Sequence, residues 1–347
     1  MIPLDDTLQI LLDKTQQRSK AHGLLLHVQS GDGQVDFRGA SGAAAPDMQF
    51  PIASIAKMYT ATMIQQLCEA GDITLDQPVQ SLLPDHDLAD LHVVNGVAYG
   101  KQVTIRHLLF QTSGVADYYE GQLAKDILQG RDQAYDLDDV LRITKALPPQ
   151  AAPDGGKAYY SDTNYQLLGA VIESVTGLSY DEALQARICA PLGLRKTHLI
   201  DPAQDHQLLP IYHKARRLDI PQTLFSMGPD GGIVSDTGEL MLFLRAFFAG
   251  KLFSPKALSH LQHWRPLTFP REYGGGLMRF HLPPWMTLWR PTPELIGHSG
   301  ASGSFAYRAP ERDIYLVGTF NQTDAPRRPF SFMLEVLRLI AKHGGDQ

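Results

Sequence analysis

The first residues of the chain alternate apolar and polar positions at helical spacing. Leucines recur every three or four residues at Leu4, Leu8, Leu11 and Leu12. This spacing predicts an amphipathic helix over residues 4–20. Two strand-like runs, GLLLHVQS and QVDFRGASG, flank the turn Gly31-Asp32-Gly33. That pattern predicts a β-hairpin directly after the opening helix.

From about Ser54 to Pro202 the apolar positions follow helical periods that Gly, Pro and Asp turns interrupt. The segments IAKMYTATMIQQLCEAG, TIRHLLFQTSG and NYQLLGAVIESVTG each predict a helix that ends at a glycine cap. Residues 235–250, SDTGELMLFLRAFFAG, have a Ser/Asp start and a glycine stop, and they predict another helix. The middle of the chain is therefore expected to be mainly helical.

Strand patterns return after residue 300. SGSFAYRAPERDIYLVGTFNQ predicts two strands joined by a turn at Ala309–Arg312, and RPFSFMLEVLRLIAKHG predicts a closing helix. We therefore predict an α+β fold, with an antiparallel sheet built from both chain ends, flanked by terminal helices, and a mainly helical domain. The expected domains are 1–65 with 203–347, and 66–202, with the active site between them.

Composition and charge narrow the class of protein. The 347 residues are 44% hydrophobic and 20% charged, which is an ordinary globular balance. The formal net charge of −6 argues against nucleic acid as a main partner, because phosphate binding favours a basic face. The histidines are scattered and the two cysteines do not form a metal-type cluster, so neither a metal nor an organic cofactor is expected.

Targeting signals and cysteines give further expectations. The sequence MIPLDDTLQILLDK lacks the features of a signal peptide, and the chain has no uninterrupted apolar stretch of about 18 residues. We therefore expect a cytoplasmic protein without a membrane span, or a periplasmic or secreted one if a leader originally preceded Met1. Cys68 and Cys189 are expected to be buried thiols, although their pairing in a disulfide stays open. The oligomeric state cannot be inferred from the sequence.

Ser54-Ile55-Ala56-Lys57 is the first candidate for chemistry. Residues three apart on a helix share a face, so the Ser54 hydroxyl and the Lys57 amine can meet. Serine becomes a good nucleophile only when a neighbouring base takes its proton. Lysine is such a base only if its surroundings lower its pKa. Alone, the motif is equally compatible with a helix start and a lysine that faces solvent.

Two other segments carry candidate residues. Tyr160-Ser161-Asp162 follows a loop rich in Gly, Pro and Asp; its tyrosine can exchange a proton, or the segment simply caps a helix. Gly297-His298-Ser299-Gly300-Ala301-Ser302-Gly303 has small residues that allow close approach to a ligand, or it forms an ordinary turn. Residues 264–291 contain all three tryptophans and form either a pocket wall or an exposed hairpin.

The order of these motifs resembles the superfamily of serine β-lactamases, D-alanyl-D-alanine carboxypeptidases and class VIII esterases. The resemblance is closest to the class C β-lactamase-like branch, which has Ser-x-x-Lys, Tyr-x-Asn and a Lys/His-x-Gly triplet. TIRHLLFQTSGVADYY and DGGIVSDTGELMLFLRAFFAGKLFSP also resemble family segments, so the similarity covers roughly residues 20–325. The resemblance implies a serine hydrolase that acts on a small ester, amide or peptide.

The resemblance also implies a role for each candidate residue. Ser54 is the acylated nucleophile, Lys57 takes or holds its proton, and Tyr160 protonates the leaving group. His298 polarises Tyr160 and contacts a substrate carboxylate. Backbone N–H groups of Ser54 and Ala301 form the oxyanion hole. Ser299 and Gly300 belong to the same substrate-binding edge.

The chain departs from the family pattern at two positions. Gln111 stands where a histidine is usual, which we interpret as a structural difference. Asp162 replaces the asparagine of Tyr-x-Asn, and an ionised carboxylate accepts hydrogen bonds but cannot donate one to an acylamino carbonyl. Asp162 is also expected to pair with Lys57 and raise its pKa. We therefore expect slow β-lactam hydrolysis and a preference for an ester or an unusual amide.

Two other classes of hydrolase fit the sequence less well. An α/β-hydrolase requires a Gly-x-Ser-x-Gly elbow, which the chain lacks, and a zinc β-lactamase requires a cluster of histidine ligands. A non-catalytic member of the same fold, serving as a peptidoglycan sensor, binder or assembly protein similar to penicillin-binding proteins, stays open, as does an acyltransferase.

Overall fold

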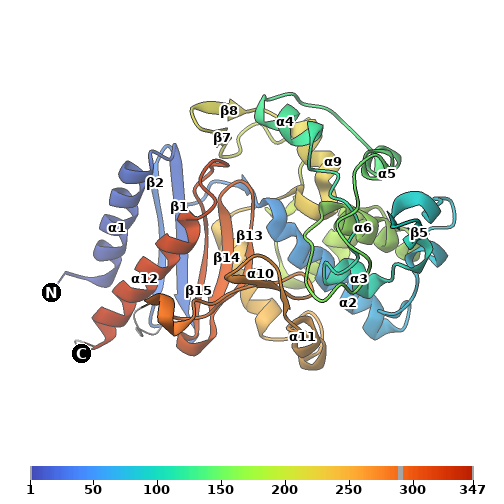
Figure 1. The fold of residues 1–347 in the computed structure, drawn as a ribbon. Coiled ribbons are helices and arrows are strands. Elements are labelled where there is room, and N and C mark those ends of the chain that lie inside the picture. Colours follow the sequence, from blue (N-terminus) through green and yellow to red (C-terminus); the bar gives the residue numbers. More distant parts are fainter. Residues whose placement is uncertain (1, 288–291, 346–347) are drawn as a thin grey trace.

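An eight-stranded antiparallel sheet built from both ends of the chain dominates one side of the fold (Figure 1). The computed structural model describes residues 2–287 and 292–345. The strand order is β10-β11-β12-β13-β14-β15-β1-β2, which places β1 beside the last strand. Its strands are β1 (Gly23–Ser30), β2 (Asp36–Gly42), β10 (Arg265–Pro266), β11 (Arg271–Tyr273), β12 (Met278–Phe280), β13 (Leu295–Ser299), β14 (Ser304–Ala309) and β15 (Ile314–Thr319).

The terminal helices α1 (Leu4–Ser19) and α12 (Arg328–Gly345) lie side by side on one face of this sheet, and α10 (Thr237–Phe248) packs on the other (Figure 1). Strand β1 is therefore buried on both faces, which explains its continuous apolar run instead of a strict alternation. Leu24 and Leu26 join the core under the terminal helices, whereas Leu25 joins the core on the α10 side.

The middle of the chain forms the helical side of the molecule (Figure 1). Helix α2 (Ala56–Ala70) lies at its centre and buries most of its residues. It is capped by Gly71, whose φ of 82° is the left-handed conformation that glycine adopts easily. The remaining helices are α3 (Ile105–Leu109), α4 (Gln122–Leu128), α5 (Leu137–Lys145), α6 (Asp162–Thr176), α7 (Tyr180–Leu184), α8 (Ala190–Leu192), α9 (Pro221–Gly231) and α11 (Pro255–Leu261).

Short strands complete the fold. The central strand β9 pairs with β3 and with β6, and two hairpins stand apart. These strands are β3 (Phe50–Pro51), β6 (His198–Leu199), β9 (Ile233–Ser235), β4 (Val93–Val94) with β5 (Val97–Ala98), and β7 (Ile211–His213) with β8 (Arg216–Leu218). The predicted α+β class, with its antiparallel sheet and flanking terminal helices, is confirmed. The residue boundaries of two separate domains stay a prediction.

Three local expectations are corrected by the structure. The helix expected in TIRHLLFQTSG ends at Leu109, because the backbone turns into the left-handed region at Gln111, where φ is 58°. Helix α6 begins at Asp162, two residues before the expected start. Cys189 is buried, but Cys68 is only half-buried, and both thiols are free.

The helices of the described chain were also compared with the requirements of a membrane span. No helix within residues 2–287 and 292–345 combines the length and the apolarity that crossing a bilayer requires.

Candidate active site

A strained turn positions Ser54. Strand β3 ends at Pro51, and the 3-10 turn η1 (Ala53–Ile55) leads directly into α2. Ala53 has a φ of 49°, a left-handed conformation that costs a residue with a Cβ about 1–2 kcal/mol. This turn places Ser54 at the wall of a cavity and Lys57 on the first turn of α2. The helix start expected at Ser54 is thus a 3-10 turn that precedes the α-helix.

Lys57 is fully buried behind Ser54. Its Nζ lies 2.5 Å from Asp162 Oδ1 and donates a hydrogen bond of 2.7 Å to the backbone carbonyl of Asp230. Burial is the largest single effect and works to lower the pKa of Lys57, but the nearby acidic groups, Asp162 foremost, together outweigh it, and the pKa lies well above its usual value. The amine is therefore protonated in the resting site.

Tyr160 lies between the serine and the lysine. Lys57 Nζ is 5.1 Å from the centre of the Tyr160 ring, which also lines the cavity next to Ser54. Burial raises the pKa of Tyr160 well above its usual value, against the opposing effects of the Lys57 charge and a hydrogen bond with Ser54. The phenol is therefore neutral at rest and adjoins the nucleophile in the cavity wall.

A second carboxylate, Asp117, adjoins Asp162. Its Oδ1 accepts hydrogen bonds from the backbone N–H of Asp162 at 3.0 Å and from that of Tyr119 at 3.1 Å. Asp117 is only 6% exposed. Burial, together with the charge of Asp162, raises the pKa of Asp117 well above its usual value. Two acidic side chains thus share the wall beside a single lysine.

A third carboxylate lies behind the lysine on α9. Asp230 Oδ2 accepts hydrogen bonds from Tyr118 Oη at 2.8 Å and from Gln166 Nε2 at 2.9 Å. Burial, followed by the charge of Asp162, raises the pKa of Asp230 to about 8. This residue therefore uses its carbonyl to hold Lys57 and its carboxyl to anchor the surrounding helices.

The raised pKa of Asp230 predicts a pH-dependent stability. The native state retains a proton that the unfolded chain releases near pH 3.8, so the favourable contribution of this group is lost as the pH rises toward about 8. We expect Asp230→Asn to flatten the fall in unfolding free energy between about pH 5 and 8 by on the order of 1 kcal/mol per pH unit. Urea unfolding at several pH values measures this, with the exposed Asp90→Asn as the control. Equal slopes in the wild type and Asp230→Asn contradict it.

His298 lies on β13 and is completely buried. Its Nδ1 donates to the carbonyl of Ser299 at 2.8 Å, and its Nε2 lies 3.5 Å from Tyr273 Oη. Burial, reinforced by the Lys57 charge, lowers the pKa of His298 to about 3, so the ring is neutral. Within the described chain it makes no hydrogen bond to Tyr160, whose ring centre is 6.3 Å away.

The turn after β13 brings small residues against η1. A Cβ at Gly300 would lie 2.7 Å from the carbonyl oxygen of Ile52, so only glycine fits there. The Gly300 N–H donates to the Ser304 carbonyl at 2.9 Å. The Ala301 N–H has no such partner in the described part of the chain, and Ala301 lines the cavity with Ser54. Ser299 lies just before this turn, with its Oγ 3.8 Å from the sulfur of Met278.

The cavity in front of Ser54 has a volume of about 610 Å³. Four acidic residues line it: Asp117, Glu120, Asp162 and Asp230. No Lys, Arg or His occurs in its lining among residues 2–287 and 292–345. Much of the remaining wall is apolar and consists of Ala124, Ile127, Ile211, Leu218, Ile220, Leu224 and Met227. The cavity therefore combines apolar surface with a cluster of acidic groups.

The tryptophan-rich segment does not contribute to this lining where it is described. Trp285 is 65% exposed and stacks on Phe269, and Trp264 contacts Arg279. Trp289 lies outside the described residues. The described part of the segment thus fits the exposed-hairpin alternative better than the pocket wall.

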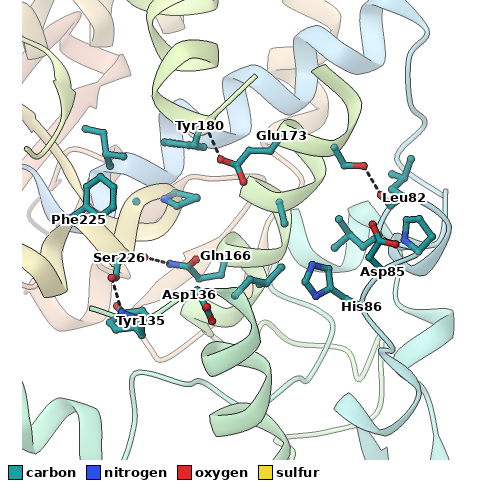
Figure 2. A pocket seen from close by; sticks show the side chains of 18 residues that line it. Leu82, Asp85, His86, Tyr135, Asp136, Gln166, Glu173, Tyr180, Phe225 and Ser226 are labelled. Carbon is teal, nitrogen blue, oxygen red and sulfur yellow. Dashed lines mark hydrogen bonds between the residues drawn. The ribbon is translucent and has the colours of Figure 1, made fainter. Parts of the chain in front are cut away.

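A second cavity, of about 480 Å³, lies on the other side of the Asp230 network (Figure 2). Gln166 joins the two: it lines this cavity, contacts the carbonyl of Ser226 at 3.1 Å, and donates to Asp230. Glu173 lies two turns further along α6 than Gln166, and its carboxylate accepts from the backbone N–H of Tyr180 at 2.8 Å (Figure 2). The polar groups in the described lining of this second cavity are largely hydrogen-bonded to other groups of the protein.

The structure thus gathers four of the sequence-predicted residues around Ser54: Lys57 contacts Asp162 and the Tyr160 ring, and Ala301 lines the same cavity. His298, Ser299 and Gly300 lie on the adjoining strand and turn. Sequence reasoning missed Asp117 and Asp230, although both stand in segments that resemble the family. A charged residue flanked by small or apolar neighbours, as in VADYY and PDGG, was the available signal.

Comparisons with known proteins agree with this geometry. Residues 9–338 match the family model described as Beta-lactamase. The chain is 31% identical over 224 residues to penicillin-binding protein 4 of Amycolatopsis lactamdurans, covering 60% of this chain and 53% of that protein. It is 31% identical over 201 residues to esterase EstB of Burkholderia gladioli, covering 52% and 48%. These alignments span about half the length of both curated relatives.

A solved structure extends the similarity to nearly the whole chain. The D-stereospecific amidohydrolase from a Streptomyces species superposes with a TM-score of 0.78 at 28% identity, covering 92% of this chain and 95% of that one. The family resemblance predicted from the three motifs is therefore confirmed.

Proposed function

The chain belongs to the Beta-lactamase family, and from this premise we propose that it is a serine hydrolase that forms an acyl-enzyme on Ser54 while cleaving a small ester or amide. The observation that carries the proposal is the position of Ser54: it lines a cavity of about 610 Å³ together with Tyr160 and has the buried Lys57 one turn behind it. This is the arrangement of nucleophile, proton carrier and orienting group that acyl transfer requires.

The proton path follows from these contacts. Ser54 passes its proton through Tyr160 toward Lys57 as its oxygen attacks the substrate carbonyl, and the phenol then protonates the leaving group. Backbone N–H groups of Ser54 and Ala301 stabilise the oxyanion. Because Lys57 is protonated at rest, it must first release a proton. The carboxylate of Asp162, 2.5 Å away, makes that release costly.

His298 acts indirectly in this proposal. Its buried, neutral ring orients Tyr273, which lies edge-on to the Tyr160 ring. Contact of His298 with a substrate carboxylate stays a prediction, and a neutral imidazole would meet such a group as a hydrogen-bonding partner without charge.

The proposal is tested by intact-mass spectrometry of the protein after brief incubation with p-nitrophenyl acetate and, separately, a fluorescent penicillin. We expect an acyl adduct with at least one reagent, and peptide mapping should locate it on the peptide that contains Ser54. The relative response to the two reagents separates an esterase from a penicillin-binding enzyme. A folded protein that forms no adduct and releases no product overturns the proposal and favours a non-catalytic binding protein.

Asp162→Asn gives a prediction on substrate preference. The amide can donate to the acylamino carbonyl of a β-lactam, and its neutral charge lets Lys57 lose a proton more easily. We expect the rate of cephalosporin hydrolysis to rise about tenfold or more, measured by the loss of β-lactam absorbance. An unchanged or lower rate in a folded variant contradicts the role that we assign to the carboxylate.

A further inference from the structure

The acidic side chains that line the cavity in front of Ser54 are not matched by basic side chains in its described lining. Its lining holds four carboxyl groups and no basic side chain among the described residues. The one buried cation next to it, Lys57, already contacts Asp162 and the carbonyl of Asp230. Among the described residues, acidic groups next to the nucleophile therefore outnumber basic ones, and a cationic ligand in the cavity would favour their ionised forms.

One oxygen of the Asp117 carboxyl accepts no hydrogen bond from the described residues. Asp117 is 6% exposed, and its Oδ1 accepts two backbone N–H bonds. Its Oδ2 accepts none from the described residues, although the side chain lines the cavity. A carboxylate oxygen at a cavity wall without a protein donor can accept a hydrogen bond from a ligand in that cavity.

Asp162 sets the position of that ligand. Its backbone N–H is bonded to Asp117, and its carboxylate touches Lys57, so the two acids meet beside Ser54. A group held between them lies close to the carbonyl that Ser54 attacks. Both acids accept hydrogen bonds when ionised, and a bound cation favours the ionised form of Asp117, whose pKa is raised by burial and by the charge of Asp162. The wall therefore suits a donor with positive charge. It repels the carbonyl oxygen of an N-acyl group.

We propose that Asp117, together with Asp162, binds the protonated amine of the substrate, so that the preferred substrate is an ester or amide of an amino acid whose α-amino group is free and whose side chain is apolar. This inference rests on the proposed function and specifies its substrate class. The ammonium lies against the two carboxylates, and the apolar side chain lies against the wall that includes Ile127, Ile220 and Met227.

The experiment compares three methyl esters that differ only at the α-position: phenylalanine, N-acetylphenylalanine and 3-phenylpropanoic acid. Both enantiomers of the first two are used, near pH 6.5, where the free amine is protonated. For the better enantiomer we expect kcat/KM with the free amine to exceed that of the other two esters by about tenfold or more.

The variant Asp117→Asn removes the charge but retains an oxygen that accepts the two backbone bonds. We expect it to lower kcat/KM for the free-amine ester by about 30-fold and for 3-phenylpropanoate by less than threefold. The matched control is Glu120→Gln, which removes a charge from an exposed residue of the same cavity and is expected to change the preference by less than threefold. Circular dichroism verifies the fold of both variants.

The outcomes separate this inference from the proposed function. Turnover that depends on Ser54 but shows no preference for the free amine, or an equal loss with all three esters in Asp117→Asn, overturns the substrate class and leaves the acyl-enzyme standing. If neither these esters nor p-nitrophenyl acetate is turned over in a Ser54-dependent way, both proposals fail together.

Discussion

Replacing Ser54 by alanine is expected to lower the turnover of p-nitrophenyl acetate by about 10⁴-fold and to eliminate the covalent adduct. The substitution removes only the Ser54 hydroxyl, and the oxygen of that hydroxyl is the atom that becomes acylated. The steady-state release of p-nitrophenol measures the rate, and intact mass detects the adduct. The residual rate reports what the oxyanion donors and the cavity supply without a nucleophile.

Ser302→Ala is the control for this loss. Ser302 also lines the cavity, but its hydroxyl donates to the carbonyl of Pro51 and to Ser304, both at 3.2 Å. Within the described part of the chain it has no hydrogen bond to a basic side chain, so we expect the turnover of Ser302→Ala to stay within about tenfold of the wild type. An adduct that persists in Ser54→Ala would show that another residue is the nucleophile.

The second large effect is expected for Lys57→Met. This change removes the proton carrier and should lower turnover by about 10³-fold. It also leaves the Asp162 carboxylate without its partner, which is expected to cost about 3 kcal/mol in the free energy of unfolding, because the pair is buried at a Nζ–Oδ1 distance of 2.5 Å. Urea unfolding measures the stability, and ester hydrolysis measures the rate.

The double variant Lys57→Met, Asp162→Asn separates the two roles. It removes both charges together, so we expect it to recover at least half of the lost stability. Turnover should not recover, since the proton carrier is still absent. A double variant that is as unstable as the single one would mean that the lost amine, and not the stranded carboxylate, destabilises the fold.

Local pattern was sufficient to predict much of the fold. The leucines of α1, the Gly-rich turn of the first hairpin and the glycine cap of α2 are all encoded within a few residues, and each was predicted close to its observed bounds. Helix α3 was overestimated, because Gln111 takes up a left-handed turn in order to bond the backbone N–H of Ser161, a contact 50 residues away. Such long-range contacts leave no periodic signal.

The candidate site, like the fold, could be predicted from the sequence only in part. The order of Ser54-x-x-Lys57, Tyr160 and His298 could be interpreted through a family resemblance, and the pairing of Lys57 with Asp162 followed from opposite charge. The meeting of Asp117 with Asp162 could not be foreseen, because it depends on the loop before α4 packing against the start of α6. Burial, which sets the raised pKa of Asp117, is likewise a property of the folded chain.

The position of β1 in the sheet bears on how the protein is synthesised. Strand β1 pairs with β2 early in the chain, but its other neighbour, β15, follows about 280 residues later (Figure 1). At a ribosomal rate of about 5–20 residues per second, β15 is synthesised roughly 15–55 s after β1, and until then the β15-facing edge of β1 lacks its native partner. Its sequence GLLLHV is strongly apolar, so in the growing polypeptide this edge is the segment most exposed to pairing with a strand from another chain.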